Sequence, residues 1–136
     1  MKREPLRGAA QAQRAAARRG FDWPKTRAYR AAMWDKLAEE IRELRAVAGN
    51  RRLAQEELGD LLFMAVNLSR HLGVDATQAL AQATRKFQRR YRFILRHEST
   101  LPPLNHPRRL AAMERLWQKA KQKEKTYHTK GTKNTK

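Results

Sequence analysis

The sequence predicts an all-α protein, and three observations support this prediction. Apolar residues recur at helical spacing over long segments, glycines follow the ends of these segments, and no convincing strand pattern occurs. The chain has 136 residues, of which 40% are hydrophobic and 32% charged, and this length is typical of one domain. We therefore expect one helical domain over residues 1–125 and a disordered basic tail over residues 126–136.

Five helices are expected along the chain. Gly20 is placed to end the first and Gly49 the second, while Pro24 suits the first turn of the second helix. Asp75, with Gln78 three residues later, forms a capping box at the start of the fourth. The expected helices span residues 6–19, 24–48, 51–72, 75–97 and about 105–121.

The net charge of +18 is unevenly distributed. Residues 1–30 hold nine Lys/Arg and two Asp/Glu, residues 31–83 hold six and eight, and residues 84–136 hold sixteen and three. Basic flanks around a slightly acidic middle favour a polyanionic partner, whether nucleotide phosphates, nucleic acid or a membrane surface. Solubility alone also explains such charges, and it is the preferred explanation for the last dozen residues.

Several classes of protein are disfavoured by composition. Cysteine is absent, which excludes a disulfide framework and a thiolate metal site. No apolar run approaches the roughly 18 residues of a membrane span, and the N-terminal segment lacks the apolar core of a secretory signal. We expect a cytoplasmic protein without a membrane partner. An organelle transit peptide is the minority alternative for the Arg-rich and Ala-rich N-terminus.

Two of the expected helices each carry a pair of carboxylates beside an apolar stripe. Glu40 and Glu43 are separated by three residues, which places them about 60° apart around a helix. Glu57 and Asp60 repeat this spacing on the next helix, in the same register relative to its apolar residues. If the two helices pack antiparallel, four carboxylates converge at the edge of the core.

Such a cluster needs a cation, because like charges at close range destabilise one another. A set of oxygen ligands without cysteine favours Mg²⁺, or Mn²⁺ in its place. The alternative is that the four carboxylates lie on solvated helix faces and pair with Arg42, Arg45 or Arg51. Spacing alone leaves both interpretations open.

A longer string that contains these carboxylates resembles a known family. The stretch "EELGDLLFMAVNLSRHLGVDATQALAQATRKFQRRYRFI", with "KLAEEIREL" ahead of it, resembles the MazG family of nucleoside triphosphate pyrophosphohydrolases. That family carries an EExxE segment followed by ExxD, and the matching residues are Glu39, Glu40, Glu43, Glu57 and Asp60. The resemblance covers about residues 10–121. Typical members contain two tandem domains, and this chain resembles the second, catalytically competent one.

The resemblance implies a helical bundle that forms a homodimer or a higher oligomer. It also implies an Mg²⁺-dependent enzyme that hydrolyses the α–β phosphoanhydride of ribo- and deoxyribonucleoside triphosphates, releasing the monophosphate and pyrophosphate, in housecleaning of the nucleotide pool. The implied metal ligands are Glu40, Glu43, Glu57 and Asp60. Glu39 or Glu56 is implied to orient or deprotonate the attacking water. The implied substrate contacts are Lys86, Arg90, Trp117 and Lys121; for Trp117, core packing is the alternative. Lys36, one helical turn before Glu40, is a further candidate for substrate binding.

The chain departs from the family pattern at two positions. Thr84 stands where the family usually has Asn, and Gln88 where it has Glu. These departures and the strongly basic balance support a second interpretation of the sequence. In this alternative the chain is a diverged or inactive member, a basic helical module that contacts nucleic acid or a protein partner through residues 84–125.

Overall fold

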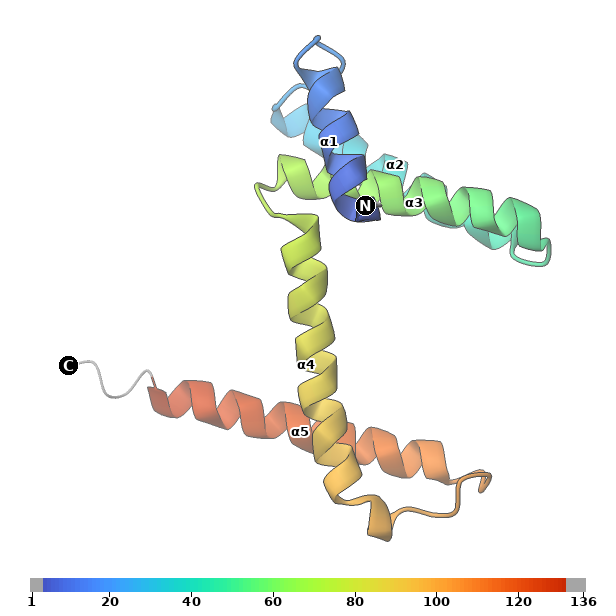
Figure 1. The fold of residues 1–136 in the computed structure, drawn as a ribbon, viewed down its shortest axis with the longest axis vertical. Coiled ribbons are helices and arrows are strands. Elements are labelled where there is room, and N and C mark those ends of the chain that lie inside the picture. The colour runs from blue at the N-terminus through green and yellow to red at the C-terminus, as the bar shows by residue number, and fades with distance from the viewer. Residues whose placement is uncertain (1–3, 132–136) are drawn as a thin grey trace. The chain divides into compact units, whose positions relative to one another are not determined.

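The computed structural model describes residues 4–131 and contains helices but no strand within that range, which confirms the all-α prediction. The elements are α1 (Pro5–Ala17), α2 (Arg27–Val47), α3 (Arg51–His71), α4 (Ala76–Arg96), the short 3₁₀ helix η1 (Glu98–Thr100) and α5 (Arg109–Gly131) (Figure 1). Contacts divide the chain into two units, residues 1–80 and residues 81–136, and each is described by itself. A single domain over residues 1–125 stays a prediction.

The start of α2 differs from the prediction. The helix begins at Arg27 rather than at Pro24, and its N-cap is Thr26, whose hydroxyl accepts a hydrogen bond from the Tyr29 N–H at 3.4 Å. Asp22, two residues before Pro24 and of a residue type that often caps helices, is engaged in other interactions. By contrast, Asp75 accepts a hydrogen bond from the Gln78 N–H at 2.9 Å, as expected for a residue that caps α4.

The last helix also differs at both ends. It begins at Arg109 rather than near Asn105, because Pro107 disfavours the helical conformation of the residue before it. It continues to Gly131, through part of the predicted tail, since the Lys- and Gln-rich sequence here favours a helix. Residues 132–136 lie outside the described residues.

Unit 1 is built on the antiparallel pair α2 and α3, which run side by side, with α1 packed across α3 (Figure 1). Its core cluster contains Met33 from α2 with Met64 and Leu68 from α3. Gln13 of α1 is buried and donates a hydrogen bond through Nε2 to the backbone carbonyl of Phe63 at 2.9 Å. This side-chain contact attaches α1 to the middle of α3.

An ionic cluster attaches the connection between α1 and α2 to the end of α3. The carboxylate of Asp22 accepts hydrogen bonds from Arg70 Nη2 at 3.0 Å, from His71 Nε2 at 3.0 Å and from the Trp23 N–H at 2.9 Å. Arg70 also donates to the side-chain oxygen of Asn67 at 2.7 Å. Burial acts to raise the pKa of Asp22, but the hydrogen bonds from Arg70, His71 and Trp23 outweigh it and lower the pKa to about 2.

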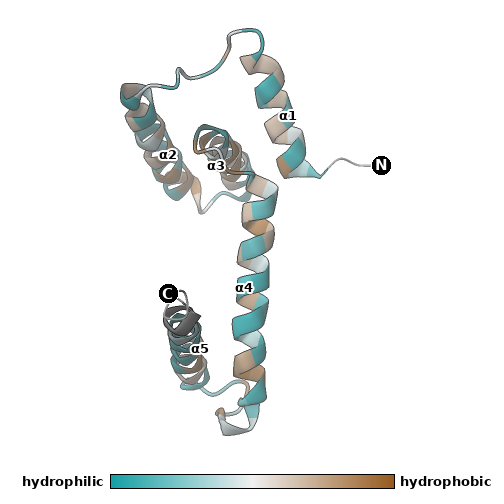
Figure 2. Ribbon diagram, turned by 90° about the vertical axis from the view of Figure 1, so that its left-hand side faces the viewer, coloured by the Kyte–Doolittle hydropathy of each residue, from teal (hydrophilic) through white to brown (hydrophobic). Residues whose placement is uncertain are grey.

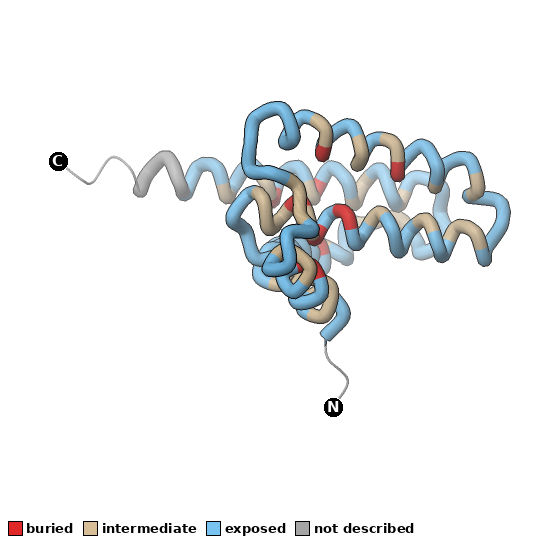
Figure 3. The backbone as a smooth tube through the Cα atoms, turned by 90° about the horizontal axis from the view of Figure 1, so that it is seen from above, coloured by how far each residue is buried: buried red, intermediate tan, exposed pale blue. Residues whose placement is uncertain are grey.

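Unit 2 joins the C-terminal part of α4 to α5 through a small apolar cluster. Its buried residues are Phe93, Ile94, Leu116 and Ala120. Hydrophobic and hydrophilic positions alternate along α4 (Figure 2), and most of the described chain is exposed or half-buried (Figure 3). Within residues 4–131, none of the helices has the length and apolar character needed to cross a bilayer. The cytoplasmic location stays a prediction.

Replacing Asp22 by Asn is expected to lower the free energy of unfolding by about 2 kcal/mol near neutral pH. The pKa of Asp22 is lower in the folded chain than its ordinary value of 3.8. The stabilisation is therefore complete above that value and is lost as the pH falls towards 2. Urea denaturation of both proteins across this range measures the difference. Asp35→Asn, on an exposed position of α2, is the control, and a gap that persists unchanged at low pH contradicts the prediction.

Candidate functional site

Three acidic side chains from α2 and α3 converge in unit 1. One carboxylate oxygen each from Glu40, Glu57 and Asp60 lies within 4.8 Å of the other two. They meet because the two helices pack antiparallel and carry these residues in the same register beside the core. Glu40 is buried, Glu57 is half-buried and Asp60 is exposed, so the cluster runs from the core edge to the surface.

Two oxygens of this cluster lack a hydrogen-bond partner among the residues that the structure describes. Glu40 Oε2 and Glu57 Oε2 are both buried and unpaired. Burying a carboxylate oxygen without a partner is unfavourable, and convergent carboxylates repel one another. A divalent cation would satisfy both oxygens, and an all-oxygen donor set fits a hard metal ion. The residues present therefore fit a metal ion.

Glu43 lies outside this group of three but close to it. Its side chain is exposed. Desolvation, followed by the charges of Glu40, Glu57 and Glu39, raises the pKa of the Glu43 carboxyl. The raised pKa means that ionised Glu43 is disfavoured first by desolvation and then by its acidic neighbours. The structure thus brings three of the four predicted ligands together and places the fourth at the rim of the cluster.

Lys36 lies one helical turn before Glu40 and faces the cluster. Its ammonium group is 3.3 Å from Glu40 Oε1 and 3.4 Å from Glu39 Oε2. The hydrogen bond with Glu40 and the charge of Glu39 raise the pKa of Lys36, which keeps the side chain protonated. Glu56 lies apart from this group and pairs with Arg52 at 3.2 Å. The two candidate bases, Glu39 and Glu56, are therefore in different surroundings.

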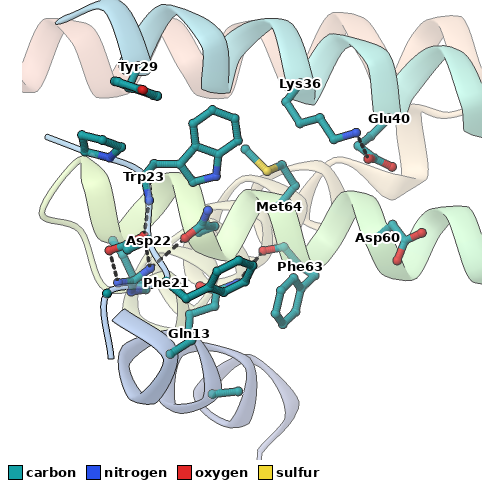
Figure 4. Close-up of a pocket in the computed structure, with 16 residues that line it drawn as sticks. Gln13, Phe21, Asp22, Trp23, Tyr29, Lys36, Glu40, Asp60, Phe63 and Met64 are labelled. Atoms are coloured by element: carbon teal, nitrogen blue, oxygen red, sulfur yellow. Dashed lines mark hydrogen bonds and ion pairs between the residues drawn. The ribbon is translucent and has the colours of Figure 1, made fainter. Parts of the chain in front are cut away.

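A cavity of about 720 Å³ extends from the carboxylates across unit 1. Lys36, Glu40 and Asp60 line one end (Figure 4). Trp23 and Tyr29 lie towards the other end, together with the Asp22 cluster (Figure 4). The volume lies within the range of about 300 to 1,000 Å³ that is typical of ligand pockets. The cavity combines a charged end with an aromatic end.

The remaining predicted contacts belong to unit 2. Arg90 forms an ion pair with Glu124 at 2.9 Å, and its guanidinium lies 5.3 Å from the centre of the Trp117 ring. The hydrogen bond from Arg90 is the main cause of the lowered pKa of Glu124. Lys86 is exposed on α4, and Lys121 is half-buried on α5. Trp117 packs against the apolar cluster of unit 2, as the core-packing alternative expects.

The sequence pattern does not reveal several residues of the cavity wall. Gln13, Phe21, Asp22 and Arg70 all line the cavity. They lie within the stretch that resembles the family, but outside its acidic motifs. Asp22 was interpretable only as a helix start. A single acidic residue in a strongly basic segment, and a basic pair at the end of α3, were the available signals, but their pairing depends on the tertiary fold.

Comparison with known proteins adds an independent line of support. A model of the MazG nucleotide pyrophosphohydrolase domain matches residues 30–94. The chain is 35% identical over 119 residues to a nucleoside triphosphate pyrophosphohydrolase of Escherichia coli (strain K12), an alignment that covers 88% of this chain and 45% of the relative. It is 45% identical over 80 residues to a nucleoside triphosphate pyrophosphohydrolase/pyrophosphatase MazG of Thermotoga maritima, covering 59% of this chain and 29% of the relative.

The chain spans less than half the length of these curated relatives. The matched segment contains most of α2 and all of α3, with all the acidic residues of the cluster. The all-α fold agrees with the family resemblance of the sequence. Over residues 30–94, the chain therefore matches the MazG nucleotide pyrophosphohydrolase domain.

Proposed function

We propose that this chain hydrolyses the α–β phosphoanhydride of nucleoside triphosphates, ribo- or deoxyribo-, in an Mg²⁺-dependent reaction that releases the monophosphate and pyrophosphate. The observation that carries the proposal is the cluster of Glu40, Glu57 and Asp60 at one end of a nucleotide-sized cavity. The relatives are named nucleoside triphosphate pyrophosphohydrolases, which supports the same reaction. Removal of unwanted nucleotides from the cellular pool is the proposed role.

The metal ligands proposed are the three clustered carboxylates, with Glu43 completing the set from the rim. The unpaired oxygens of Glu40 and Glu57 support this assignment. A cation would also relieve the repulsion from acidic neighbours that, after desolvation, raises the pKa of Glu43. When bound, Mg²⁺ would offset the charge of the triphosphate and make a coordinated water more acidic. Mn²⁺ offers a similar preference for oxygen ligands.

The side chains of the chain itself supply positioning and proton transfer. Lys36 is a fixed cation beside Glu40 and is suited to hold a phosphate oxygen. Glu39, which shares Lys36 with Glu40, is proposed to orient the attacking water and accept its proton. Glu56 is the second candidate for this role, but its pairing with Arg52 directs it elsewhere. Lys86, Arg90 and Lys121 are proposed as further phosphate contacts.

Exposed apolar side chains on α2 and α3 support a homodimer. Ile41 is 51% exposed, and Leu58 and Leu62 of α3 are 46% and 51% exposed. Apolar side chains grouped on a surface often mark an interface, and a second copy of the same helix pair offers a matching apolar face. The oligomer is part of the proposal.

Nucleic-acid binding is the second candidate function, and the observation that favours it is the charge of residues 84–136, with sixteen Lys/Arg against three Asp/Glu. Basic segments bind nucleic acid through phosphate contacts that weaken steeply with salt. In this alternative the carboxylate cluster has no catalytic role.

Mg²⁺ is expected to raise the melting temperature of the wild-type protein by a few degrees, because it binds the folded chain and not the unfolded one. Asp60→Asn is expected to abolish most of this increase. Without metal, the same variant is expected to be slightly more stable than the wild type, since one repelling charge is gone. Differential scanning calorimetry with and without Mg²⁺ measures both effects. Glu114→Gln, exposed on α5, is the control that keeps the full response.

Purified protein with Mg²⁺ is expected to release pyrophosphate from nucleoside triphosphates. Glu57→Gln and Asp60→Asn are each expected to lower kcat/KM by at least about 100-fold, as loss of a metal-binding group does. Asp35→Asn is the matched control on α2. Release of orthophosphate without pyrophosphate contradicts the proposal. The proposal is also contradicted if the protein releases no pyrophosphate but binds RNA with a steep salt dependence.

The two candidate bases can be separated by their variants. Glu39→Gln is expected to lower kcat by about 100-fold or more with little change in KM, because the amide cannot accept the proton of water. Glu56→Gln is expected to have a much smaller effect. Steady-state kinetics of pyrophosphate release at saturating Mg²⁺ measure both, and the opposite order would assign the role to Glu56.

A further inference from the structure

The cavity in unit 1 continues well beyond the carboxylates into a compartment with aromatic walls. Phe21, Trp23, Tyr29 and Phe63 line it (Figure 4), and we refer to these four residues as the aromatic compartment. The rings of Trp23 and Tyr29 meet edge to face, with centroids 6.2 Å apart. The carboxylates and Lys36 occupy the other end of the same cavity (Figure 4).

We propose that the aromatic compartment binds the nucleobase of the triphosphate whose phosphates lie at the carboxylate end. This inference rests on the proposed function. It assigns a binding site to the nucleobase, which is the part of the substrate that differs between nucleotides. A nucleoside triphosphate has a flat base at one end and charged phosphates at the other. The cavity has aromatic rings, beside the paired Asp22 and Arg70, at one end, and Lys36 with the carboxylates at the other. Bases stack on aromatic side chains with useful affinity and little sequence preference.

Exposure of the compartment's rings supports a bound partner. Phe21 is 85% exposed although it lines the cavity, and Phe63 is 49% exposed. Aromatic side chains that lie beside a cavity and outside the core are available for stacking with a ligand. Trp23 is only half-buried, with part of its surface packed against the Met33 cluster. Its ring therefore has a fixed position and a face towards the cavity.

Gln13 provides a polar group at this end of the cavity. Its side chain is 7% exposed, and its Nε2 donates to the Phe63 carbonyl, which fixes the orientation of the amide. The amide oxygen, Oε1, is buried and has no hydrogen-bond partner among the described residues. A buried acceptor without a partner is unfavourable. The N–H groups of a nucleobase are donors of the kind that such an acceptor lacks.

Asp22 is the positioning residue for this compartment. It accepts a hydrogen bond from the backbone of Trp23 at 2.9 Å and is itself held by Arg70 and His71 at the end of α3. It lies between Phe21 and Trp23 in the chain, so that its attachment sets the place of both rings. The Asp22 carboxylate thus acts on the base through its neighbours.

Trp117, the residue that the family resemblance implies in base stacking, has different surroundings. Its ring lies 5.6 Å from the ring of Phe87, centroid to centroid, and 5.3 Å from the guanidinium of Arg90. These contacts within unit 2 already engage the Trp117 ring. The assignment of the base to the aromatic compartment therefore predicts different behaviour for Trp23 and Trp117 variants.

The test is isothermal titration calorimetry in the presence of Mg²⁺, with α,β-methylene-ATP as the nucleotide probe and inorganic tripolyphosphate as the probe without a base. Phe21→Ala and Trp23→Ala are expected to weaken binding of α,β-methylene-ATP by about 5- to 100-fold each. Neither is expected to change binding of tripolyphosphate. Asp22→Asn is expected to weaken the nucleotide probe alone, by a smaller factor. Trp34→Ala, a half-exposed Trp of α2 outside the cavity, is the matched control.

Two results overturn the inference. One is unchanged nucleotide binding in Phe21→Ala. This variant removes little packing because the ring is exposed, so it remains a valid test even if Trp23→Ala does not fold. The other is a loss of base-dependent binding in Trp117→Ala while Trp23→Ala retains it. Neither depends on turnover. A protein that binds the nucleotide as expected but releases no pyrophosphate contradicts the proposed function and leaves this inference supported.

Discussion

Packing of α2 against α3 is the constraint on which the rest of the site depends. The apolar stripes of the two helices bury Met33, Met64 and Leu68, and this burial brings carboxylates from both helices within 4.8 Å of one another. The hydrophobic free energy of the interface opposes the repulsion between the acidic groups. Without that interface, the carboxylates would separate into solvent. By holding the carboxylates together, the packing of α2 against α3 favours the binding of a cation.

The basic side chains of the two units have different acidic partners. In unit 1, Lys36 is the cation in contact with the acidic cluster, and its ammonium is shared between Glu39 and Glu40. In unit 2, Arg89 and Arg90 both bind the carboxylate of Glu124, at 3.0 and 2.9 Å. Arg90 is thus partly neutralised where it stands. A phosphate contact by this residue requires it to exchange one anionic partner for another.

How much was predictable from the sequence differs between the fold and the site. The helices and the register of Glu40 with Glu57 follow from local periodicity, because each helix buries one stripe and its neighbour must match it. The start of α2 was not predictable in this way, since Asp22 is an equally good helix cap until Arg70 and His71 are placed beside it. Likewise, the pairing of Gln13 with the Phe63 carbonyl joins residues 50 positions apart, and such a contact leaves no local signal.

The Asp22 cluster has a consequence for the dimensions of the site. Helix α3 carries Asp60 and, ten residues later, Arg70, which holds the Asp22 segment. At about 1.5 Å per residue, a rigid helix fixes these two points on the order of 15 Å apart along its axis. The helix therefore fixes the distance between the carboxylate end and the aromatic end of the cavity. Under the proposed placement of base and phosphates, a molecule of another length reaches one end only, and the backbone of α3 sets the accepted length.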